Sequence, residues 1–261
     1  MKFGMPTLVE CKDIYECALV ASECGLDFIE INMSFPQYLP DSLDVEKLLE
    51  IKRERGLFYT IHADEQLNPF DFNPKVADCY LEVMRDTVRF AKTLDIPVIN
   101  MHLLKGVYVT LPGKVILLTD VYDEEYMAGV RRFISMCEEE IGDADLKIAI
   151  ENVDSNPFTE SQLKALELFL KSPVFALTLD VGHEVCLGNK DTHVFEKYPQ
   201  MIRHLHLHDS DGKKPHLALG DGTLDVIGKI NAFGGETCLL EVKTIEGLKK
   251  SVEYLKSKEI M

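Results

Sequence analysis

The chain has 261 residues, 46% of them hydrophobic, which is enough for a sizeable core and matches the usual length of an eight-fold (β/α) barrel. Its 44 Asp and Glu against 28 Lys and Arg give a net charge of −16, which repels a nucleic-acid backbone and disfavours nucleic acid as a partner. The seven cysteines include no Cys-x-x-Cys pair, so we expect reduced thiols of a cytoplasmic protein. With no apolar run of ~18 residues and no signal-peptide pattern, no membrane partner is expected.

Strand-like and helix-like segments alternate along the first half of the chain. The predicted strands are Lys2–Leu8, Asp27–Asn32, Leu57–Ala63 and Pro97–Leu103. The helices between them carry Ile14, Cys17, Ala18, Ala21 and Cys24, then Val45, Leu48 and Leu49, then the stretch from Pro74 to Leu94. A polar loop, residues 64–73, follows the third strand, and an unusually long connection, residues 104–123, follows the fourth.

The same alternation continues to the end of the chain. Strands are predicted at Leu146–Glu151, Val174–Asp180, Ile202–His208 and Thr237–Val242. Helices are predicted around Tyr126–Ile141, Glu160–Leu170, Val194–Tyr198, Leu224–Asn231 and Ile245–Leu255. Eight alternations without a linker predict one domain over residues 1–261, a single (β/α)8 TIM barrel. A doubly wound open sheet is the alternative, but no G-x-G-x-x-G follows the first strand.

The seventh predicted strand has an imidazole at every second position, His204, His206 and His208, with leucines facing the other way. Burying polar rings without partners costs about 1–3 kcal/mol each, so something polar must face this side of the strand. Any one of these histidines is also explained as a hydrogen-bonded structural group. The other strands decide between these interpretations.

Every strand has one apolar face and one face that becomes polar towards its carboxyl end, where barrel active sites are built. The polar strand ends that aim at one small volume are His62, His102, Glu151, Asp180, His206 and Glu241. Crowded carboxylates repel one another, and a divalent cation removes that repulsion. Two glutamates, an aspartate and a histidine suit Mn, Co, Mg or Zn, and donor type alone does not choose among them.

These residues and their neighbours resemble the xylose isomerase-like barrel superfamily, the sugar (phosphate) isomerases and epimerases that also include endonuclease IV. The resemblance covers essentially the whole chain. It rests on IEIN at Ile29–Asn32, IHADEQLNPFD at Ile61–Asp71, IAIEN at Ile148–Asn152, LDVGH at Leu179–His183, HLHDSDG at His206–Gly212, HLALGDG at His216–Gly222 and LEVK at Leu240–Lys243.

The resemblance implies one divalent metal ion held by Glu151, Asp180, His206 and Glu241. It further implies that Glu151 and Glu241 act as an acid/base pair, while the metal polarises a carbonyl and holds an enediolate. His183 falls where the sugar enzymes have a substrate-contacting histidine.

Three further residues are expected to line the substrate site, namely His62, His102 and Lys243. Lys243 lies two residues after Glu241, so its side chain is expected to point into the barrel as well. It would suit a substrate phosphate, and the alternative is a lysine exposed to solvent.

Two departures from the superfamily pattern bear on the reaction. The free-ketose epimerases carry an arginine where this chain has Gly212. Endonuclease IV holds three zinc ions, and its first set of ligands matches a second metal site here at His62, His102 and Glu151. Its third zinc would need His183, His216 and an aspartate, but Lys214 occupies the aspartate position.

The sequence leaves two interpretations open for each of three further features. Gly220–Thr223 lies where barrels often bind phosphate, although Asp221 within it would oppose an anion. Residues 64–73 and 104–123 are either lids or contacts of a homodimer. His208 and Asp209 either orient His206 or form a turn.

We therefore predict a cytoplasmic, metal-dependent isomerase or epimerase of a sugar, sugar phosphate or related polyol, working by proton transfer through an enediolate. Its expected partner is a small-molecule carbohydrate. The alternatives are an endonuclease IV-like zinc phosphodiesterase acting at abasic DNA and a non-catalytic, metal-assisted sugar-binding protein.

Overall fold

Eight parallel strands close into a barrel in the computed structural model, which describes residues 1–261. The barrel strands, in their order around the barrel, are β1 (Lys2–Pro6), β2 (Phe28–Asn32), β3 (Phe58–His62), β4 (Val98–His102), β7 (Lys147–Glu151), β8 (Phe175–Asp180), β9 (Ile202–Leu207) and β10 (Thr237–Leu240). β10 pairs with β1 to complete the circle. The predicted single (β/α)8 TIM barrel is confirmed, with strand ends within two residues of the predicted ones.

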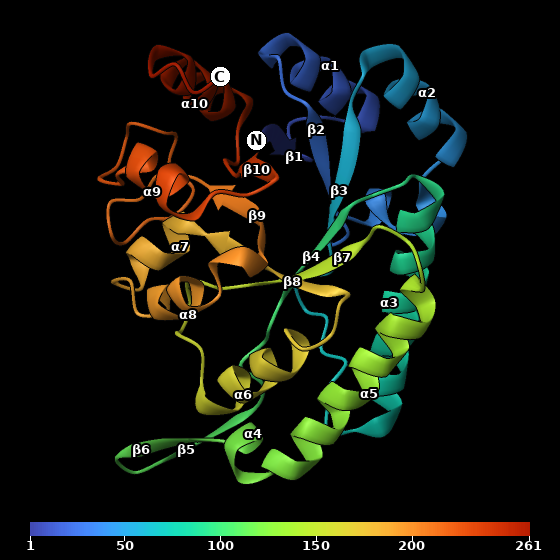
Figure 1. Ribbon diagram of the computed structural model, residues 1–261, viewed down its shortest axis with the longest axis vertical. Coiled ribbons are helices and arrows are strands. Elements are labelled where there is room, and N and C mark those ends of the chain that lie inside the picture. The colour runs from blue at the N-terminus through green and yellow to red at the C-terminus, as the bar shows by residue number, and fades with distance from the viewer.

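Helices cover the outside of the barrel (Figure 1). They are α1 (Ile14–Cys24), α2 (Val45–Arg55), α3 (Pro74–Thr93), α4 (Leu118–Val121), α5 (Asp123–Ile141), α6 (Glu160–Phe169), α7 (Val181–Cys186), α8 (Thr192–Lys197), α9 (Val226–Phe233) and α10 (Ile245–Ser257). Local signals set their ends: Asp13 caps the first turn of α1 through the N–H of Glu16, and Gly25 ends it at a φ of 74°. No helix is both long enough and apolar enough to cross a membrane.

The main apolar core lies between the strands and the helices, whereas the barrel interior is layered. Phe28 and Phe58 stack at the amino-terminal end with ring centroids 5.1 Å apart. Gly4 makes room for them, because a Cβ at this position would lie 2.3 Å from the ring of Phe28. Buried polar side chains, Glu30 and His204 among them, fill the next layer. The interior therefore becomes polar towards the carboxyl ends of the strands, as the sequence predicts.

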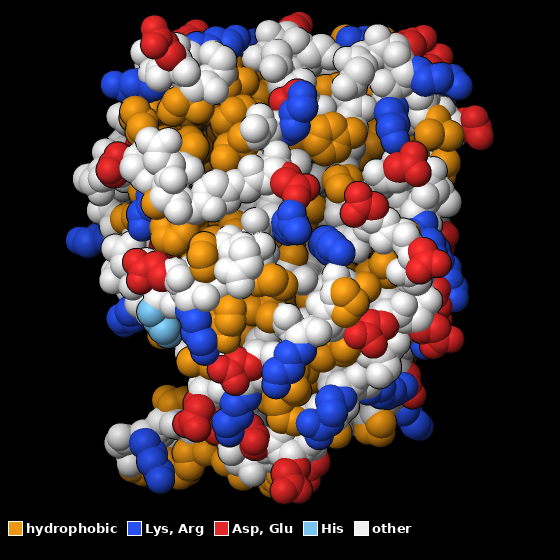
Figure 2. Space-filling view, viewed as in Figure 1, with side chains coloured by type: hydrophobic (Ala, Val, Ile, Leu, Met, Phe, Trp, Pro, Cys, Tyr) orange, Lys and Arg blue, Asp and Glu red, His pale blue; other side chains and the backbone are white.

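Residues 104–123, predicted as a long connection, have secondary structure of their own. They contain the hairpin of β5 (Tyr108–Leu111) and β6 (Lys114–Leu117), followed by α4. Pro112 and Gly113 form the two-residue turn, with Gly113 at a φ of 85°, and Pro-Gly is a preferred pair for such a turn. The hairpin projects from the body of the molecule at the lower left of Figures 1 and 2.

The seven cysteines are all free, and five of them are buried. Cys17, Cys24 and Cys137, which the sequence places on apolar helix faces, are among the buried ones. No disulfide framework holds this fold together, so its stability rests on packing.

Candidate metal centre

Four acidic and imidazole side chains meet at the carboxyl end of the barrel, each from a different strand. Glu151 ends β7 and Asp180 ends β8, while His206 lies near the end of β9 and Glu241 directly follows β10. The strand register pairs Asp180 with His206, so these side chains lie at one height in the barrel. Candidate ligand atoms of the four residues lie within 4.8 Å of one another.

One ring nitrogen stands at the middle of this group. His206 Nδ1 lies 2.9 Å from Glu151 Oε1 and 3.2 Å from Glu241 Oε2. Asp180 Oδ2 is 3.9 Å away from the same nitrogen. We name these four residues the metal centre, for the cation that they could hold.

The donor set of the metal centre fits a divalent cation. His206 Nδ1, Glu151 Oε1 and Glu241 Oε2 are buried and make no well-aligned hydrogen bond within the protein. Buried polar atoms without partners are costly, and a bound cation would satisfy all three at once. Three carboxylates and one imidazole are ligands that Mn, Co, Mg or Zn accept.

A second group of possible ligands shares Glu151 with the metal centre. Its Oε2 atom lies 3.1 Å from His102 Nε2 and 3.5 Å from His62 Nε2. His62 Nδ1 lies 2.8 Å from the backbone oxygen of Ala63, which fixes the ring with Nε2 facing inward. The structure therefore brings the second predicted set together as well, with Glu151 between the two sets.

Glu151 and His206 in the metal centre shift each other's pKa. Burial disfavours ionisation of Glu151, but His206 and His102 outweigh it and hold the pKa of that carboxyl well below its usual range. Against the effect of burial, Glu151 and Glu30 raise the pKa of His206 well above the usual value. Glu151 thus stays ionised, as does Glu241, whose pKa is also held well below its usual range, and a cation-binding site requires such anionic ligands.

A carboxylate below the metal centre, which sequence reasoning did not single out, touches two imidazoles. Glu30 Oε1 lies 3.2 Å from His206 Nε2, and Oε2 lies 3.0 Å from His204 Nε2. Thr60 Oγ1 donates a hydrogen bond to Oε2 at 2.8 Å. Strand parity places Glu30 inside the barrel, but only the closed barrel shows which rings it meets.

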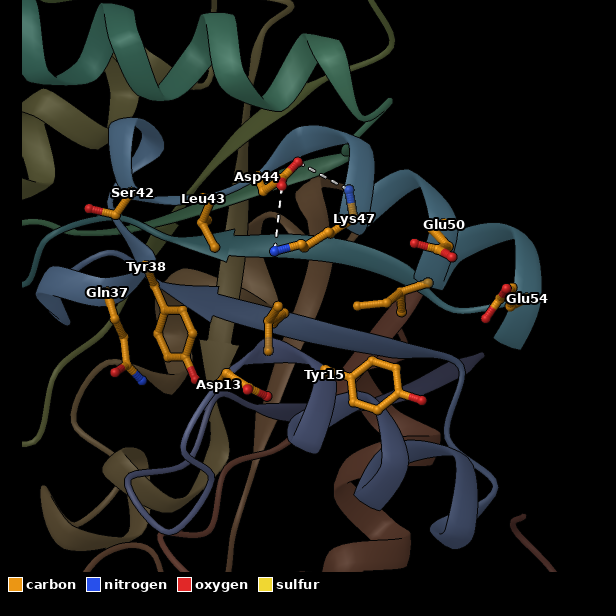
Figure 3. Close-up of a pocket in the computed structure, with 12 residues that line it drawn as sticks. Asp13, Tyr15, Gln37, Tyr38, Ser42, Leu43, Asp44, Lys47, Glu50 and Glu54 are labelled. Carbon is orange, nitrogen blue, oxygen red and sulfur yellow. Dashed lines mark hydrogen bonds and ion pairs between the residues drawn. The ribbon is translucent and has the colours of Figure 1, made fainter.

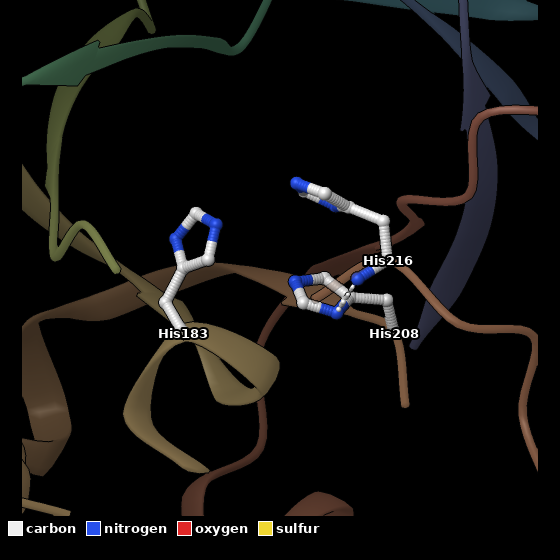
Figure 4. A group of neighbouring side chains, drawn as sticks. All are labelled: His183, His208 and His216. Atoms are coloured by element: carbon white, nitrogen blue, oxygen red, sulfur yellow. Dashed lines mark hydrogen bonds between the residues drawn. The ribbon is translucent and has the colours of Figure 1, made fainter. Parts of the chain in front are cut away.

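Three histidines form a separate group beside the metal centre (Figure 4). His208 is held at both nitrogens: Nδ1 accepts the backbone N–H of His216 at 2.7 Å, and Nε2 lies 3.1 Å from Asp180 Oδ1. The sequence left two interpretations for His208, a partner that orients His206 or part of a turn. In the structure its ring contacts Asp180 instead. It is Asp180 that this ring positions.

The other two imidazoles of this group each have one free nitrogen. His183 Nδ1 lies 3.1 Å from the backbone oxygen of Asn152, and His216 Nδ1 lies 3.1 Å from that of Glu241. Because a carbonyl oxygen only accepts, each Nδ1 carries a proton. Burial lowers the pKa of His216 to about 4, which keeps its ring neutral.

A cavity of about 830 Å³ opens above these groups. His62, His102 and His183 line it, together with Lys243, whose Nζ lies 2.8 Å from Glu241 Oε1. Its walls also include residues from the two long connections, Glu65, Gln66, Asn68, Asp71, Leu104, Lys105, Gly106 and Val107. All predicted site residues therefore lie in the metal centre, in the second ligand group or on this cavity.

Another cavity, of about 550 Å³, lies on the outside of the barrel between α1 and α2 (Figure 3). Tyr15, Tyr38 and Lys47 line it, and none of the polar strand ends reaches it. Its acidic side chains, Asp13, Asp44, Glu50 and Glu54, are on helices or at their caps. Nothing in it matches the chemistry at the mouth of the barrel.

Comparison with known proteins places this geometry among related folds. The family described as "Xylose isomerase-like TIM barrel" matches residues 18–258. An uncharacterized protein of Methanocaldococcus jannaschii, MJ1311, is 27% identical over 270 residues, covering 98% of this chain and 88% of that protein.

Two solved structures share the fold over the full length of the chain. A D-tagatose 3-epimerase-like protein superposes with a TM-score of 0.78 and 25% identity, covering all of this chain and 98% of the other. The IOLI protein with a bound zinc atom superposes with a TM-score of 0.75 and 17% identity, with the same coverage.

Proposed function

The chain belongs to the xylose isomerase-like TIM barrel family, and we propose that it is a divalent-metal-dependent isomerase or epimerase of a carbohydrate. The observation that carries this proposal is the contact of one imidazole nitrogen, His206 Nδ1, with both Glu151 and Glu241. Two ionised carboxylates beside one cation site are what proton removal and return at a carbon next to a carbonyl require. The D-tagatose 3-epimerase-like neighbour supports the same class of reaction.

Each glutamate can take one half of the proton transfer. Both have a pKa held well below the usual range, so both are ionised at neutral pH and either can act as the base. One carboxylate removes the proton from the carbon next to the carbonyl, and the electron pair moves to the carbonyl oxygen to give an enediolate. The other carboxylate takes up a proton from water and delivers it to the carbon, and the first carboxylate then releases its proton to water, which restores both groups.

The neighbouring residues bind and orient the substrate. When bound at Glu151, Asp180, His206 and Glu241, a divalent ion would polarise the carbonyl and offset the charge of the enediolate oxygen. His183, which lines the cavity, binds a substrate hydroxyl through Nε2. Asp180 keeps its orientation through His208 Nε2 and the backbone N–H of His183, which donates to Oδ1 at 2.7 Å.

Proton exchange in heavy water tests this proposal. The protein loaded with Mn²⁺ or Zn²⁺ is incubated with a panel of ketoses and aldoses, and deuterium at the carbons next to the carbonyl is followed by NMR. We expect incorporation into at least one sugar, and a fall of about 100-fold or more in Glu151→Gln and in Glu241→Gln.

Glu50→Gln, on the wall of the cavity between α1 and α2, is the matched control and should exchange at the wild-type rate. Full activity in either active-site variant would contradict the acid/base assignment. No exchange into any sugar by a protein that binds its metal would favour the sugar-binding alternative.

One observation favours a second candidate, the zinc phosphodiesterase. His62 and His102 meet Glu151 as a further ligand set, which that reaction also uses. Against it, Lys214 stands where the third zinc needs a carboxylate, and the net charge of −16 repels DNA. Incision of an abasic duplex by the zinc-loaded protein would favour this candidate, as would three tightly bound ions per chain.

A further inference from the structure

The loops after the seventh and eighth barrel strands are where TIM barrel enzymes commonly bind a substrate phosphate, through backbone N–H groups and a helix N-terminus. In this chain those strands are β9 and β10, followed by residues 208–225 and 241–244. Whether a phosphate can bind there depends on where the N–H groups of these loops already donate.

The chain places its own anion in the first of these loops. Asp209 is 1% exposed, and its Oδ1 accepts the N–H of Ser210 at 2.8 Å and that of Leu224 at 3.0 Å. Its Oδ2 accepts the N–H of Gly220 at 2.9 Å. The loop closes tightly around this carboxylate, since a Cβ on Gly222 would lie 2.3 Å from Asp209 Oδ1. Three donors that would suit a phosphate are therefore already taken.

In the second loop, backbone N–H groups also already donate to side chains of this chain. The first N–H of α10, that of Ile245, donates to Glu10 Oε2 at 2.5 Å. Thr244 Oγ1 accepts the N–H of Gly247 at 3.1 Å. A carboxylate and a hydroxyl of this chain thus occupy the start of the helix that follows the eighth strand.

Side-chain charge in the cavity also disfavours a phosphate. The carboxylates on its wall are Glu65, Asp71, Asp154 and Glu241, and the cations are Lys105 and Lys243. Lys243 is already paired with Glu241, and Lys105 Nζ lies 5.5 Å from the ring centroid of Tyr108. A phosphate dianion would enter a cavity with more acidic than basic groups, whereas a neutral sugar would meet no such repulsion.

We infer that the substrate carries no phosphate group and is a neutral polyol with a carbonyl. This inference rests on the proposed function, because that function supplies the carbohydrate substrate. Its test measures binding and does not need turnover.

Calorimetric titration of the metal-loaded protein tests the inference. The probes are D-tagatose and D-fructose, their 6-phosphates, and inorganic phosphate. We expect each 6-phosphate to bind at least about 10-fold more weakly than its parent sugar, or not at all, and inorganic phosphate to show a Kd above about 10 mM. A 6-phosphate that binds as tightly as its parent sugar, or tighter inorganic phosphate binding, would overturn the inference.

Asp209→Ala provides the internal control. Removing the carboxylate frees three N–H donors, so inorganic phosphate should raise the Tm of this variant more than that of the wild type. An equal effect on both proteins would show that the loop is no anion cradle and would overturn the argument from Asp209. If the variant does not fold, the wild-type titrations still decide. Proton exchange into sugar phosphates alone would reject this inference and leave the proposed isomerase standing.

Discussion

Glu30 contacts the metal centre from below, at the ring nitrogen of His206 that faces away from the other ligands. A histidine that binds metal through one nitrogen commonly has a carboxylate or carbonyl partner on the other, which fixes the tautomer and raises ligand basicity. Glu30 Oε1 lies 3.2 Å from Nε2, so the charge of Glu30 favours a proton on that nitrogen and leaves Nδ1 as the atom that would bind a cation.

We predict that Glu30→Gln weakens metal binding without abolishing it. The amide keeps the size of the side chain but loses the charge that stabilises the Nε2 proton, so the affinity for Mn²⁺ or Zn²⁺ should fall about 10–100-fold. Competition with a chromogenic chelator measures this directly. Glu50→Gln should bind as the wild type does, and an unchanged affinity in Glu30→Gln would show that Glu30 only fills the barrel.

At the scale of single residues, the sequence predicts which side chains share the inner face of the barrel. It does not predict which atoms of these side chains contact one another. Strand parity places Glu151, Asp180 and His206 on the inner face, and the structure brings them together. The partners of Glu30 and His208 depend on which strands become neighbours and on ring orientation. Periodicity carries neither kind of information, since it concerns one strand at a time.

Among the elements, the short helix α7 has a steric requirement at its second residue. A Cβ added to Gly182 would lie 2.0 Å from the ring of His208, too close for any contact. That ring is wedged between Asp180 and the backbone of His216, so it has no room to withdraw. Glycine at position 182 therefore lets the His208 ring reach Asp180.

We predict that Gly182→Ala lowers the free energy of unfolding by about 1–3 kcal/mol, because the added methyl group forces the His208 ring or α7 to move. Urea denaturation measures the change. Gly129→Ala in α5 is the matched control, since its Cβ would lie 3.4 Å from the nearest atom, and it should change stability by less than about 1 kcal/mol. Equal effects in the two variants would mean that His208 is not tightly seated.

Element boundaries follow from the sequence where local signals are strong. Helix α1 ends just before Gly25, and α3 begins at Pro74, as these two residue types predict. The β5–β6 hairpin was missed although Pro112-Gly113 is a turn signal, because its strands are exposed and lack the polar–apolar alternation of a half-buried strand.

At the scale of the whole molecule, barrel closure is what assembles the site. Glu151 and Glu241 are 90 positions apart in the numbering, and only a sheet that returns to its first strand brings both to His206. Eight strand–helix alternations in one chain of this length predict that closure from the sequence. The shape of the cavity above the site depends on how residues 64–73 and 104–123 fold. The sequence of these connections does not predict that fold.

Diffraction from crystals grown with Mn²⁺, recorded on both sides of the manganese absorption edge, tests the central claim most directly. We predict an anomalous peak within about 2.5 Å of ligand atoms from Glu151, Asp180, His206 and Glu241. The absence of a peak at saturating Mn²⁺, or a peak bonded to other residues alone, would contradict the account.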